Sequence, residues 1–222
     1  MLNHLLYTVY KNNNTPNEDC KDLDCFDSLK GKVGIIHIFY VLKGGWELTE
    51  NLVFYQSKYG ATEQYASWLK EMISCDVMGQ NETLPQNLKS YRNIVVAGGI
   101  YKGEITGRDF MKRNMEAFKD HRVAVLAVGL EEFYKGLTEA LWLYQFKEFE
   151  IDVEVFYARG EYDYQNLTFM DRVTIRTGNV IFRRKIKRGS RERINILRDR
   201  TTAYDWKEKS YLEPLVDWLD SG

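Results

Sequence analysis

The sequence predicts an α/β domain built on a doubly wound parallel sheet of five strands, with helices on both faces and a long basic insertion before the last helix. From residue 52 onward, short runs of β-branched and aromatic residues alternate with segments of helical periodicity. This alternation indicates β-α units joined into a parallel sheet. Hydrophobic residues make up 44% of the chain and charged residues 28%, which is typical of a soluble globular protein with a packed core.

Five segments have the composition of short buried strands. They are residues 52–55, 75–78, 94–97, 123–128 and 153–157, of which the second is weak and the third strong. With helices between them, these strands fit a doubly wound sheet.

Four helices are expected between and after these strands. The first covers residues 61–72 and has Tyr65, Ala66, Leu69 and Met72 at helical spacing. The second contains Phe110, Met111, Met115 and Phe118, and the third covers residues 134–149. The last covers residues 206–219 and is predicted to bury Tyr211, Leu212, Leu215 and Leu219.

The bulk properties exclude several classes of protein. The chain has 222 residues, which we interpret as one domain with additions, since single domains commonly have roughly 100–200 residues. Its net charge of −1 gives no overall attraction to nucleic acid or anionic lipid. Cys20, Cys25 and Cys75 form no CxxC pair, and no histidines stand at zinc-ligand spacing. We therefore expect no metal site and a reducing, cytoplasmic location.

Residues 1–50 differ from the rest and are treated as an N-terminal extension of residues 51–222. Their longest apolar run, residues 33–42, contains His37 and is about half the roughly 20 residues that a membrane-spanning helix needs. Acidic residues precede this run, so a signal peptide is not expected either. The extension is predicted to pack weakly or to be an upstream stretch of an over-long gene; the alternative is an extra strand at residues 33–42.

The segment after the first predicted strand has the chemistry of a phosphate-binding loop. It reads Ser57-Lys58-Tyr59-Gly60-Ala61-Thr62. Ser57 and Thr62 offer hydroxyl donors, Gly60 permits a tight turn, and the loop opens a helix whose N-terminus favours an anion. Because the loop is neither GxGxxG nor GxxxxGK[ST], a phosphate monoester is favoured over a dinucleotide or ATP. The alternative is an ordinary strand-to-helix turn with capping hydroxyls.

Several ordered motifs resemble those of flavodoxin-domain proteins, particularly the bacterial group related to menaquinone-dependent protoporphyrinogen dehydrogenase. They are F-Y-Q-S-K-Y-G-A-T-E-Q-Y-A-S-W (residues 54–68), A-G-G-I-Y-K-G-E-I-T-G (97–107), A-V-G-L (127–130), F-Y-A-R-G-E-Y-D-Y (156–164) and Y-D-W (204–206). The resemblance covers nearly everything except the first fifty residues. It implies a flavodoxin-like fold with the strand order 2-1-3-4-5.

The resemblance also implies FMN as the cofactor. Its phosphate loop matches Ser57, Lys58, Tyr59, Gly60, Ala61 and Thr62. The first loop around the isoalloxazine ring matches Gly98, Gly99, Ile100, Tyr101, Lys102 and Gly103, and the second matches Gly129, Leu130 and Glu131. Glycines in the first ring loop would let the backbone approach a flat ligand closely.

Two departures from the family pattern affect this expectation. Tyr59 stands where the best-known flavodoxins have threonine, so the phosphate would rely more on backbone amides and Lys58. Neither ring loop contains tryptophan, which leaves Tyr101 as the aromatic candidate beside the flavin; the alternative is a solvent-facing tyrosine. Glu131 and Glu132 could tune the flavin, but solvation is the favoured interpretation.

The connection at about residues 166–202 is longer than a compact unit needs and strongly basic. Arginines and lysines between Arg172 and Arg200 alternate with apolar residues such as Phe169, Met170 and Ile186. Such a segment could lie on an anionic membrane surface, at the inner face of the membrane, or bind an acidic partner. The alternative is a solvated lid docked on its own domain. No stacking platform or recognised nucleic-acid-binding fold accompanies it, so nucleic acid is not an expected partner.

The redox chemistry would belong to the flavin, and no catalytic side chain is predicted. The histidines (His4, His37 and His121) form no Ser/His/Asp constellation, so hydrolysis is disfavoured. The favoured hypothesis is an FMN-dependent oxidoreductase acting on a quinone or porphyrinogen. The alternative is a non-enzymatic electron carrier between protein partners. A third hypothesis is a flavodoxin-like scaffold that has lost its cofactor.

Overall fold

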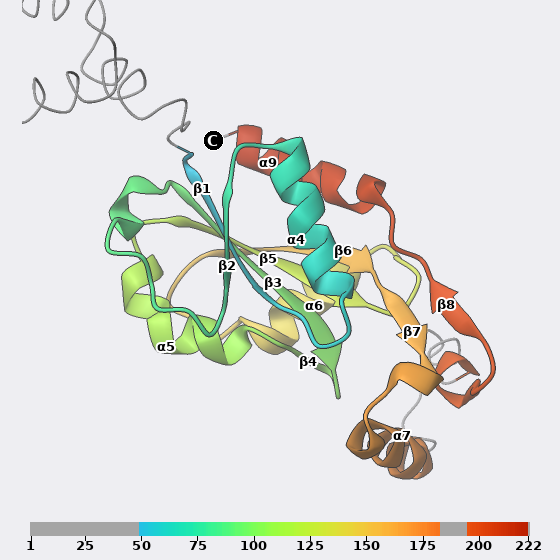
Figure 1. Ribbon diagram of the computed structural model, residues 1–222. Helices are drawn as coiled ribbons and strands as arrows, with labels where there is room; N and C mark the ends of the chain where they lie inside the picture. The colour runs from blue at the N-terminus through green and yellow to red at the C-terminus, as the bar shows by residue number, and fades with distance from the viewer. Residues whose placement is uncertain (1–48, 183–194, 222) are drawn as a thin grey trace, which may run out of the picture. The chain divides into compact units, whose positions relative to one another are not determined.

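The computed structural model describes residues 49–182 and 195–221 and contains the predicted parallel sheet (Figure 1). Its strands are β1 (Asn51–Gln56), β2 (Asp76–Gly79), β3 (Asn93–Tyr101), β5 (Arg122–Gly129) and β6 (Val153–Arg159), in the order β2-β1-β3-β5-β6. Counting only these parallel strands, this is the order 2-1-3-4-5, so the predicted flavodoxin-like topology is confirmed. Residues 1–48 lie outside the described range. The predictions for the N-terminal extension, including the alternative of a strand at residues 33–42, therefore concern residues outside that range.

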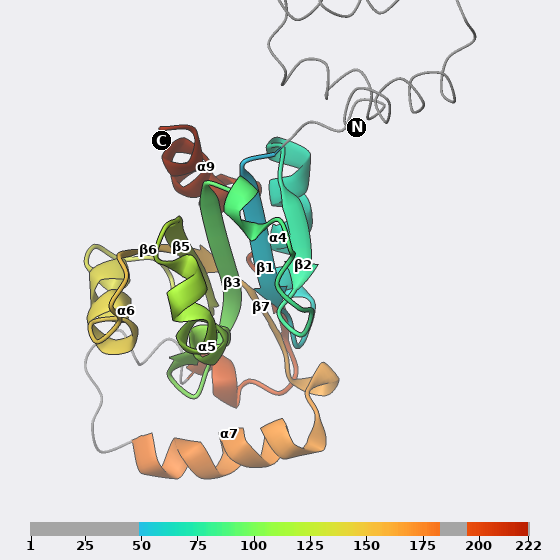
Figure 2. The same ribbon diagram turned by 90° about the vertical axis from the view of Figure 1, so that its left-hand side faces the viewer.

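Helices cover both faces of the sheet (Figure 2). On one face, α4 (Ala61–Met72) and α9 (Glu213–Asp220) pack against Val53, Val95 and Leu126. On the other face, α5 (Arg108–Phe118) and α6 (Leu137–Gln145) pack against Phe54 and Val96, among others. Neighbouring strand residues point to opposite faces, which is why central strands buried on both sides are continuous apolar runs.

Two of the predicted helices have the expected position. Helix α4 covers residues 61–72 as predicted and buries Tyr65, Ala66 and Leu69, whereas Met72 is 38% exposed. Helix α5 buries Phe110, Met111 and Phe118 as predicted. Met115 is half-buried.

The other two predicted helices are shorter than expected. The third, predicted at residues 134–149, is α6 and begins only after Gly136, whose φ of 92° is not helical. The last, predicted at residues 206–219, is replaced at first by a 3-10 turn, η3 (Lys209–Leu212), and α9 starts at Glu213 with Pro214 in its first turn. Proline is favourable at that position because it lacks an N–H and has a helical φ. Leu212, Leu215 and Leu219 are buried as predicted, and Tyr211 is half-buried.

Three short strands were not predicted. β4 (Glu104–Ile105) pairs antiparallel with the end of β3 through a turn at Lys102 and Gly103, which have φ of 54° and 90°. Positive φ at both residues is typical of the tight hairpin turn that matches strand twist. β7 (Glu161–Asp163) and β8 (Ala203–Asp205) form a separate antiparallel pair.

The described part of the basic insertion docks on this small sheet. A second 3-10 turn, η2 (Tyr164–Asn166), leads into α7 (Phe169–Phe182). Leu167, Ile175 and Ile196 pack with Tyr162 and Tyr164 of the β7 segment. The basic residues from Arg183 to Arg193 lie outside the described residues. Within the described part of the chain, no helix has the length and apolarity needed to cross a membrane.

Candidate functional site

A cleft of about 1210 Å³ opens beyond the carboxyl ends of β1, β3 and β5, where ligands bind in doubly wound sheets. It brings together nearly all of the residues that the sequence predicts for FMN. Those lining it are Ser57, Lys58, Tyr59, Ala61, Thr62, Gly99, Ile100, Tyr101, Lys102, Gly103, Gly129, Leu130 and Glu131. Gly60 and Gly98 are the two predicted site residues that do not line it.

The loop between β1 and α4 has the form of an anion site. The Ser57 Oγ accepts a hydrogen bond of 3.0 Å from the Gly60 amide, and Gly60 has a φ of +103°, which favours glycine. No side chain caps α4. The amides of Ala61 and Thr62, in the first turn, have no acceptor among the described residues. These amides and the helix dipole are therefore available to a phosphate.

The first predicted ring loop is only partly a loop. Gly98, Gly99, Ile100 and Tyr101 belong to β3, because the chain continues as a hairpin instead of leaving the sheet. A Cβ at Gly98 would lie 1.7 Å from the Thr106 carbonyl oxygen. Glycine at position 98 therefore allows the backbone of the hairpin to pass over the strand; close approach of Gly98 to a ligand stays a prediction.

Tyr101 lies at the end of β3 and folds over Gly99. A Cβ at Gly99 would lie 2.6 Å from the Tyr101 ring, so glycine at that position makes room for the ring. Burial raises the pKa of Tyr101 to about 12, and the Tyr59 and Asp171 side chains add to this shift. The Tyr101 phenol is therefore neutral at physiological pH, and it lines the cleft rather than facing open solvent.

The second predicted ring loop is held by a tyrosine that the sequence did not single out. The Tyr157 hydroxyl donates a 2.6 Å hydrogen bond to the Glu131 carbonyl oxygen. A Cβ at Gly129 would lie 2.6 Å from the same hydroxyl. Burial raises the pKa of Tyr157, which keeps this donor protonated. Glu131 lines the cleft, whereas Glu132 is exposed.

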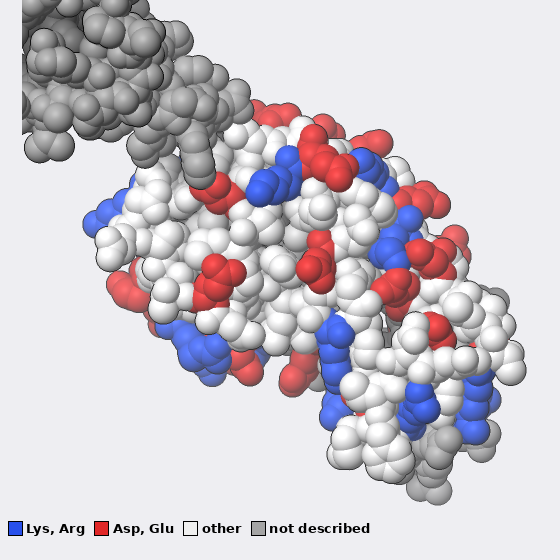
Figure 3. Space-filling model, viewed as in Figure 1, with Lys and Arg blue, Asp and Glu red and all other residues white. Residues whose placement is uncertain are grey.

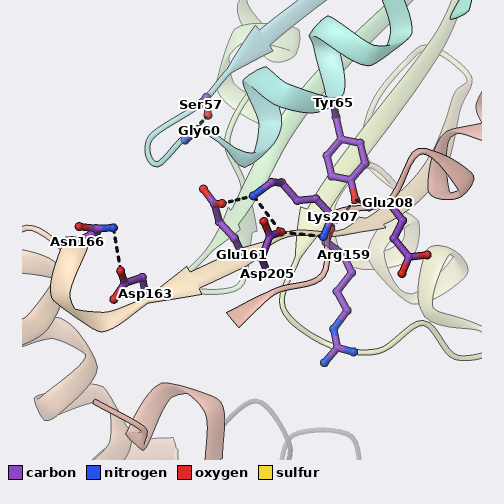
Figure 4. Close-up of polar contacts among 10 residues, drawn as sticks. All are labelled: Ser57, Gly60, Tyr65, Arg159, Glu161, Asp163, Asn166, Asp205, Lys207 and Glu208. Atoms are coloured by element: carbon purple, nitrogen blue, oxygen red, sulfur yellow. Dashed lines mark hydrogen bonds and ion pairs between the residues drawn. The ribbon is translucent and has the colours of Figure 1, made fainter. Parts of the chain in front are cut away.

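Charged residues of the β7–β8 pair border the phosphate loop (Figure 4). Lys207 forms ion pairs with Glu161 and with Asp205, the latter at 3.0 Å. The Glu161 Oε1 lies 3.5 Å from where a Cβ at Gly60 would be. Burial alone would lower the pKa of Lys207, but the hydrogen bonds to Glu161 and Asp205 raise it. The positive charge of Lys207 therefore balances acidic groups beside the loop.

Tyr65 fixes the start of α4 against the same region. Its hydroxyl donates a 2.6 Å hydrogen bond to the Arg159 carbonyl oxygen and accepts one of 3.2 Å from the Glu208 amide. Figure 4 shows this hydroxyl between the end of β6 and the segment that follows β8. Three segments that are distant in sequence are thereby joined below the phosphate loop.

Two buried polar atoms at the wall of the cleft have no hydrogen-bond partner among the described residues. They are the Gln80 Oε1 and the Thr106 Oγ1, and both residues line the cleft. Buried polar groups are normally paired; here the Gln80 Oε1 lies beside Gly107 and the Thr106 Oγ1 lies beside Gly98. Gln80 follows β2 directly, and its place at a strand end could have indicated it; Thr106 lies in the A-G-G-I-Y-K-G-E-I-T-G motif.

Comparisons with known proteins identify the family of the chain. A family model described as a flavodoxin domain matches residues 52–186. Among solved structures, the chain is similar to the two-electron reduced flavodoxin of Megasphaera elsdenii, with 14% identity and a TM-score of 0.39 over 49% of this chain and 84% of that chain. It is also similar to oxidised Flavodoxin 2 of Bacillus cereus, with 21% identity and a TM-score of 0.36 over 49% and 83%. A flavoprotein of Lactobacillus acidophilus NCFM in complex with FMN has 15% identity and a TM-score of 0.34 over 49% and 91%. No curated protein matches the sequence.

Proposed function

We propose an FMN-dependent redox function for this chain, which belongs to the flavodoxin domain family. One observation carries the proposal: the N-terminus of α4, which no side chain caps, and the loop that turns at Gly60 lie at a cleft at the carboxyl edge of the sheet. The reading of this loop as an ordinary turn with capping hydroxyls is disfavoured, because the Ser57 hydroxyl bonds within the loop and no side chain caps the helix.

The residues of the cleft fit the parts of FMN. The amides of Ala61 and Thr62 and the buried Thr62 side chain would hold the phosphate. Gln80 and Thr106, which also line the cleft, would lie beside the ribityl chain. Tyr101 and the segment from Gly129 to Glu131 would bound the ring on two sides.

When bound, FMN would supply the one- and two-electron chemistry. The chain's own part is to orient the flavin, to limit its contact with water and to set its electrostatic surroundings. The neutral Tyr101 phenol adds no charge beside the ring, and the Tyr157 hydrogen bond fixes the Gly129–Glu131 backbone.

For the substrate, we propose a quinone or porphyrinogen, as in the dehydrogenase group that the sequence resembles. The cleft, at about 1210 Å³, exceeds the roughly 300–1,000 Å³ of ordinary ligand pockets, which supports room for a second molecule beside FMN. Apolar residues of α6, including Leu137 and Leu141, contribute to its lining. These features support an oxidoreductase.

The second candidate is an electron carrier between proteins. Phe133 is 53% exposed and Tyr144 is 77% exposed, and exposed aromatic residues suit a protein partner. On the face shown in Figure 3, however, acidic and basic side chains of the described residues are interspersed. That face offers no extended acidic surface of the kind typical of flavodoxin carriers.

We also propose that the insertion can contact the inner face of a membrane. Phe169 is 76% exposed and Met170 is 69% exposed at the start of α7, and arginines and lysines follow in the sequence. Apolar side chains next to basic ones favour anionic lipid surfaces.

The first test is the absorbance spectrum of the purified chain, followed by heat release and chromatography of any flavin. FMN in the supernatant would support the cofactor assignment. A colourless protein that takes up no added FMN would favour the scaffold that has lost its cofactor. Turnover of menaquinone or protoporphyrinogen by the purified protein would then support the oxidoreductase, whereas activity only with an added reductase and acceptor protein would favour the carrier.

A further inference from the structure

The start of the insertion helix α7 contacts the phosphate loop, chiefly through the carboxylate of Asp171. Lys58 Nζ lies 2.5 Å from the Asp171 Oδ2, and the Tyr59 hydroxyl donates a hydrogen bond to the same carboxylate oxygen. The Tyr59 hydroxyl also accepts a 3.2 Å hydrogen bond from the Thr168 amide. Thr168, which precedes α7, and Asp171, in its first turn, thus bond to the two loop residues that precede Gly60.

This contact engages the ammonium group of Lys58, the cation of the phosphate loop, in an ion pair. Lys58 Nζ lies 5.5 Å from the centre of the Tyr59 ring and 5.8 Å from that of Tyr101. Its pKa is raised chiefly by the hydrogen bond to Asp171. Burial opposes ionisation of Asp171, but hydrogen bonds from Lys58 and Tyr59 lower its pKa. Both groups therefore carry their charge at neutral pH.

A flavin phosphate in the same loop would be a second anion beside one ammonium group. Its negative charge would attract Lys58 and repel Asp171, whose side chain is only 21% exposed and so is incompletely screened. Riboflavin has the same ring and ribityl chain without the phosphate, and it would leave the ion pair intact.

We propose that Asp171 is a specificity-determining residue that lowers the preference of this chain for phosphorylated flavin, because its carboxylate competes with the phosphate for Lys58. This inference rests on the proposed FMN function. Coupling between two sites is reciprocal, so binding of FMN weakens the attachment of α7, and attachment of α7 weakens binding of FMN.

The test uses dissociation constants of FMN and riboflavin, measured by flavin fluorescence on the full chain. In Asp171→Asn we expect FMN to bind about three- to tenfold more tightly, the range for removing one partly exposed charge, and riboflavin to bind as before. In Lys58→Met we expect weaker FMN binding, and adding Asp171→Asn to it should recover only the part of the affinity that repulsion between Asp171 and the phosphate removes. Asp217→Asn, on the exposed side of α9, is the control for loss of one negative charge.

A second readout is hydrogen exchange of the backbone amides of residues 168–175. FMN should increase exchange there in the unmodified chain, riboflavin should not, and Asp171→Asn should show fast exchange with or without ligand. If Asp171→Asn weakens FMN binding, or changes FMN and riboflavin binding equally, the competition is refuted. If Asp171→Asn does not fold, exchange of residues 168–175 in the unmodified chain decides, since the competition requires FMN, and not riboflavin, to increase it. If the unmodified chain binds neither flavin, the FMN function itself fails.

Discussion

Individual glycines around the cleft are needed by the backbone for different physical reasons. Gly98 faces the Thr106 backbone, and Gly103 has a φ of +90° with open space where a Cβ would be. The two glycines are therefore required for different reasons. Gly98 is required by close approach of two segments, whereas Gly103 is required by the conformation of the hairpin turn.

We expect Gly98→Ala to lower the free energy of unfolding by about 3 kcal/mol or more, since the new methyl group meets backbone atoms that cannot rotate away. Gly103→Ala should cost only about 1–2 kcal/mol, the strain of a left-handed conformation. Urea unfolding of both variants measures the difference. Equal losses would show that the hairpin can move away from β3.

Tyr157 is the residue on which the position of the second ring loop depends. Tyr157→Phe removes the hydrogen bond to the Glu131 carbonyl oxygen, which should cost about 1 kcal/mol of stability and speed FMN dissociation several-fold. Tyr211→Phe is a matched control, because Tyr211 is half-buried and no hydrogen bond of its hydroxyl is found among the described residues. Stopped-flow measurement of FMN release tests the prediction, and identical rates in the two variants would contradict it.

Among the structural elements, the β7–β8 pair links the insertion to the phosphate loop. Lys207 has a side chain only 12% exposed and pairs with both strands, through Glu161 and Asp205. Lys209 forms a single pair with Glu71 in which both side chains are about half exposed, at 51% and 56%. The two lysines therefore allow a comparison of a shielded pair with a solvated one.

We expect Lys207→Gln to destabilise the chain by about 1.5–3 kcal/mol, the range for a lost hydrogen bond to a charged group. It should also weaken FMN binding, because Glu161 then faces the phosphate loop unbalanced. Lys209→Gln should change stability by less than about 1 kcal/mol. Thermal unfolding and FMN titration of the two variants provide the measurement; similar effects in both would mean that Lys207 is no more than a surface charge.

The sequence allowed the long elements to be predicted but not the short ones. The central strands β1, β3 and β5 are buried on both faces, so each contains an unbroken apolar run such as residues 94–97. β4 has two residues, and β7 and β8 have three each, too few for a periodicity to be visible. β7 and β8 also pair across the insertion, so neither has a partner nearby in the sequence.

The same distinction holds for the candidate site. The phosphate loop and the Gly129–Glu131 segment are local sequences at strand ends, so a motif was sufficient to find them. Tyr157 and Asp171 have no local signature, because each acts on a loop that is remote in sequence. The packing role of Gly98 could not be predicted from the sequence, because a missing Cβ can make room for the protein's own backbone as well as for a ligand.

In the molecule as a whole, the sheet separates two apolar cores, and tyrosines are buried in and around both. Tyr65, Tyr91 and Tyr162 are exposed by 0%, 7% and 4%. Burial raises the pKa of Tyr91 and of Tyr162 to about 12, from 10. Burial also raises the pKa of Cys75 to about 11, from 9. Each of these groups is neutral when protonated, and burial disfavours its charged form. The folded chain therefore holds these protons more tightly than the unfolded chain does.

This proton affinity predicts how stability depends on pH in alkaline solution. Between pH 10 and 12 the unfolded chain has released the tyrosine protons that the folded chain keeps, so the free energy of unfolding must fall as pH rises. The stabilisation is fully present below about pH 9, begins to be lost through Cys75, and falls more steeply above pH 10 by up to about 1.4 kcal/mol per pH unit for each buried tyrosine. Urea unfolding from pH 8 to 11.5 measures the slope. Tyr162→Phe should reduce the slope above pH 10 and leave it unchanged between pH 8 and 9. A free energy of unfolding that stays constant to pH 11 would mean that these tyrosines reach solvent in the folded chain, and that the region around Tyr162, where the insertion docks, opens readily.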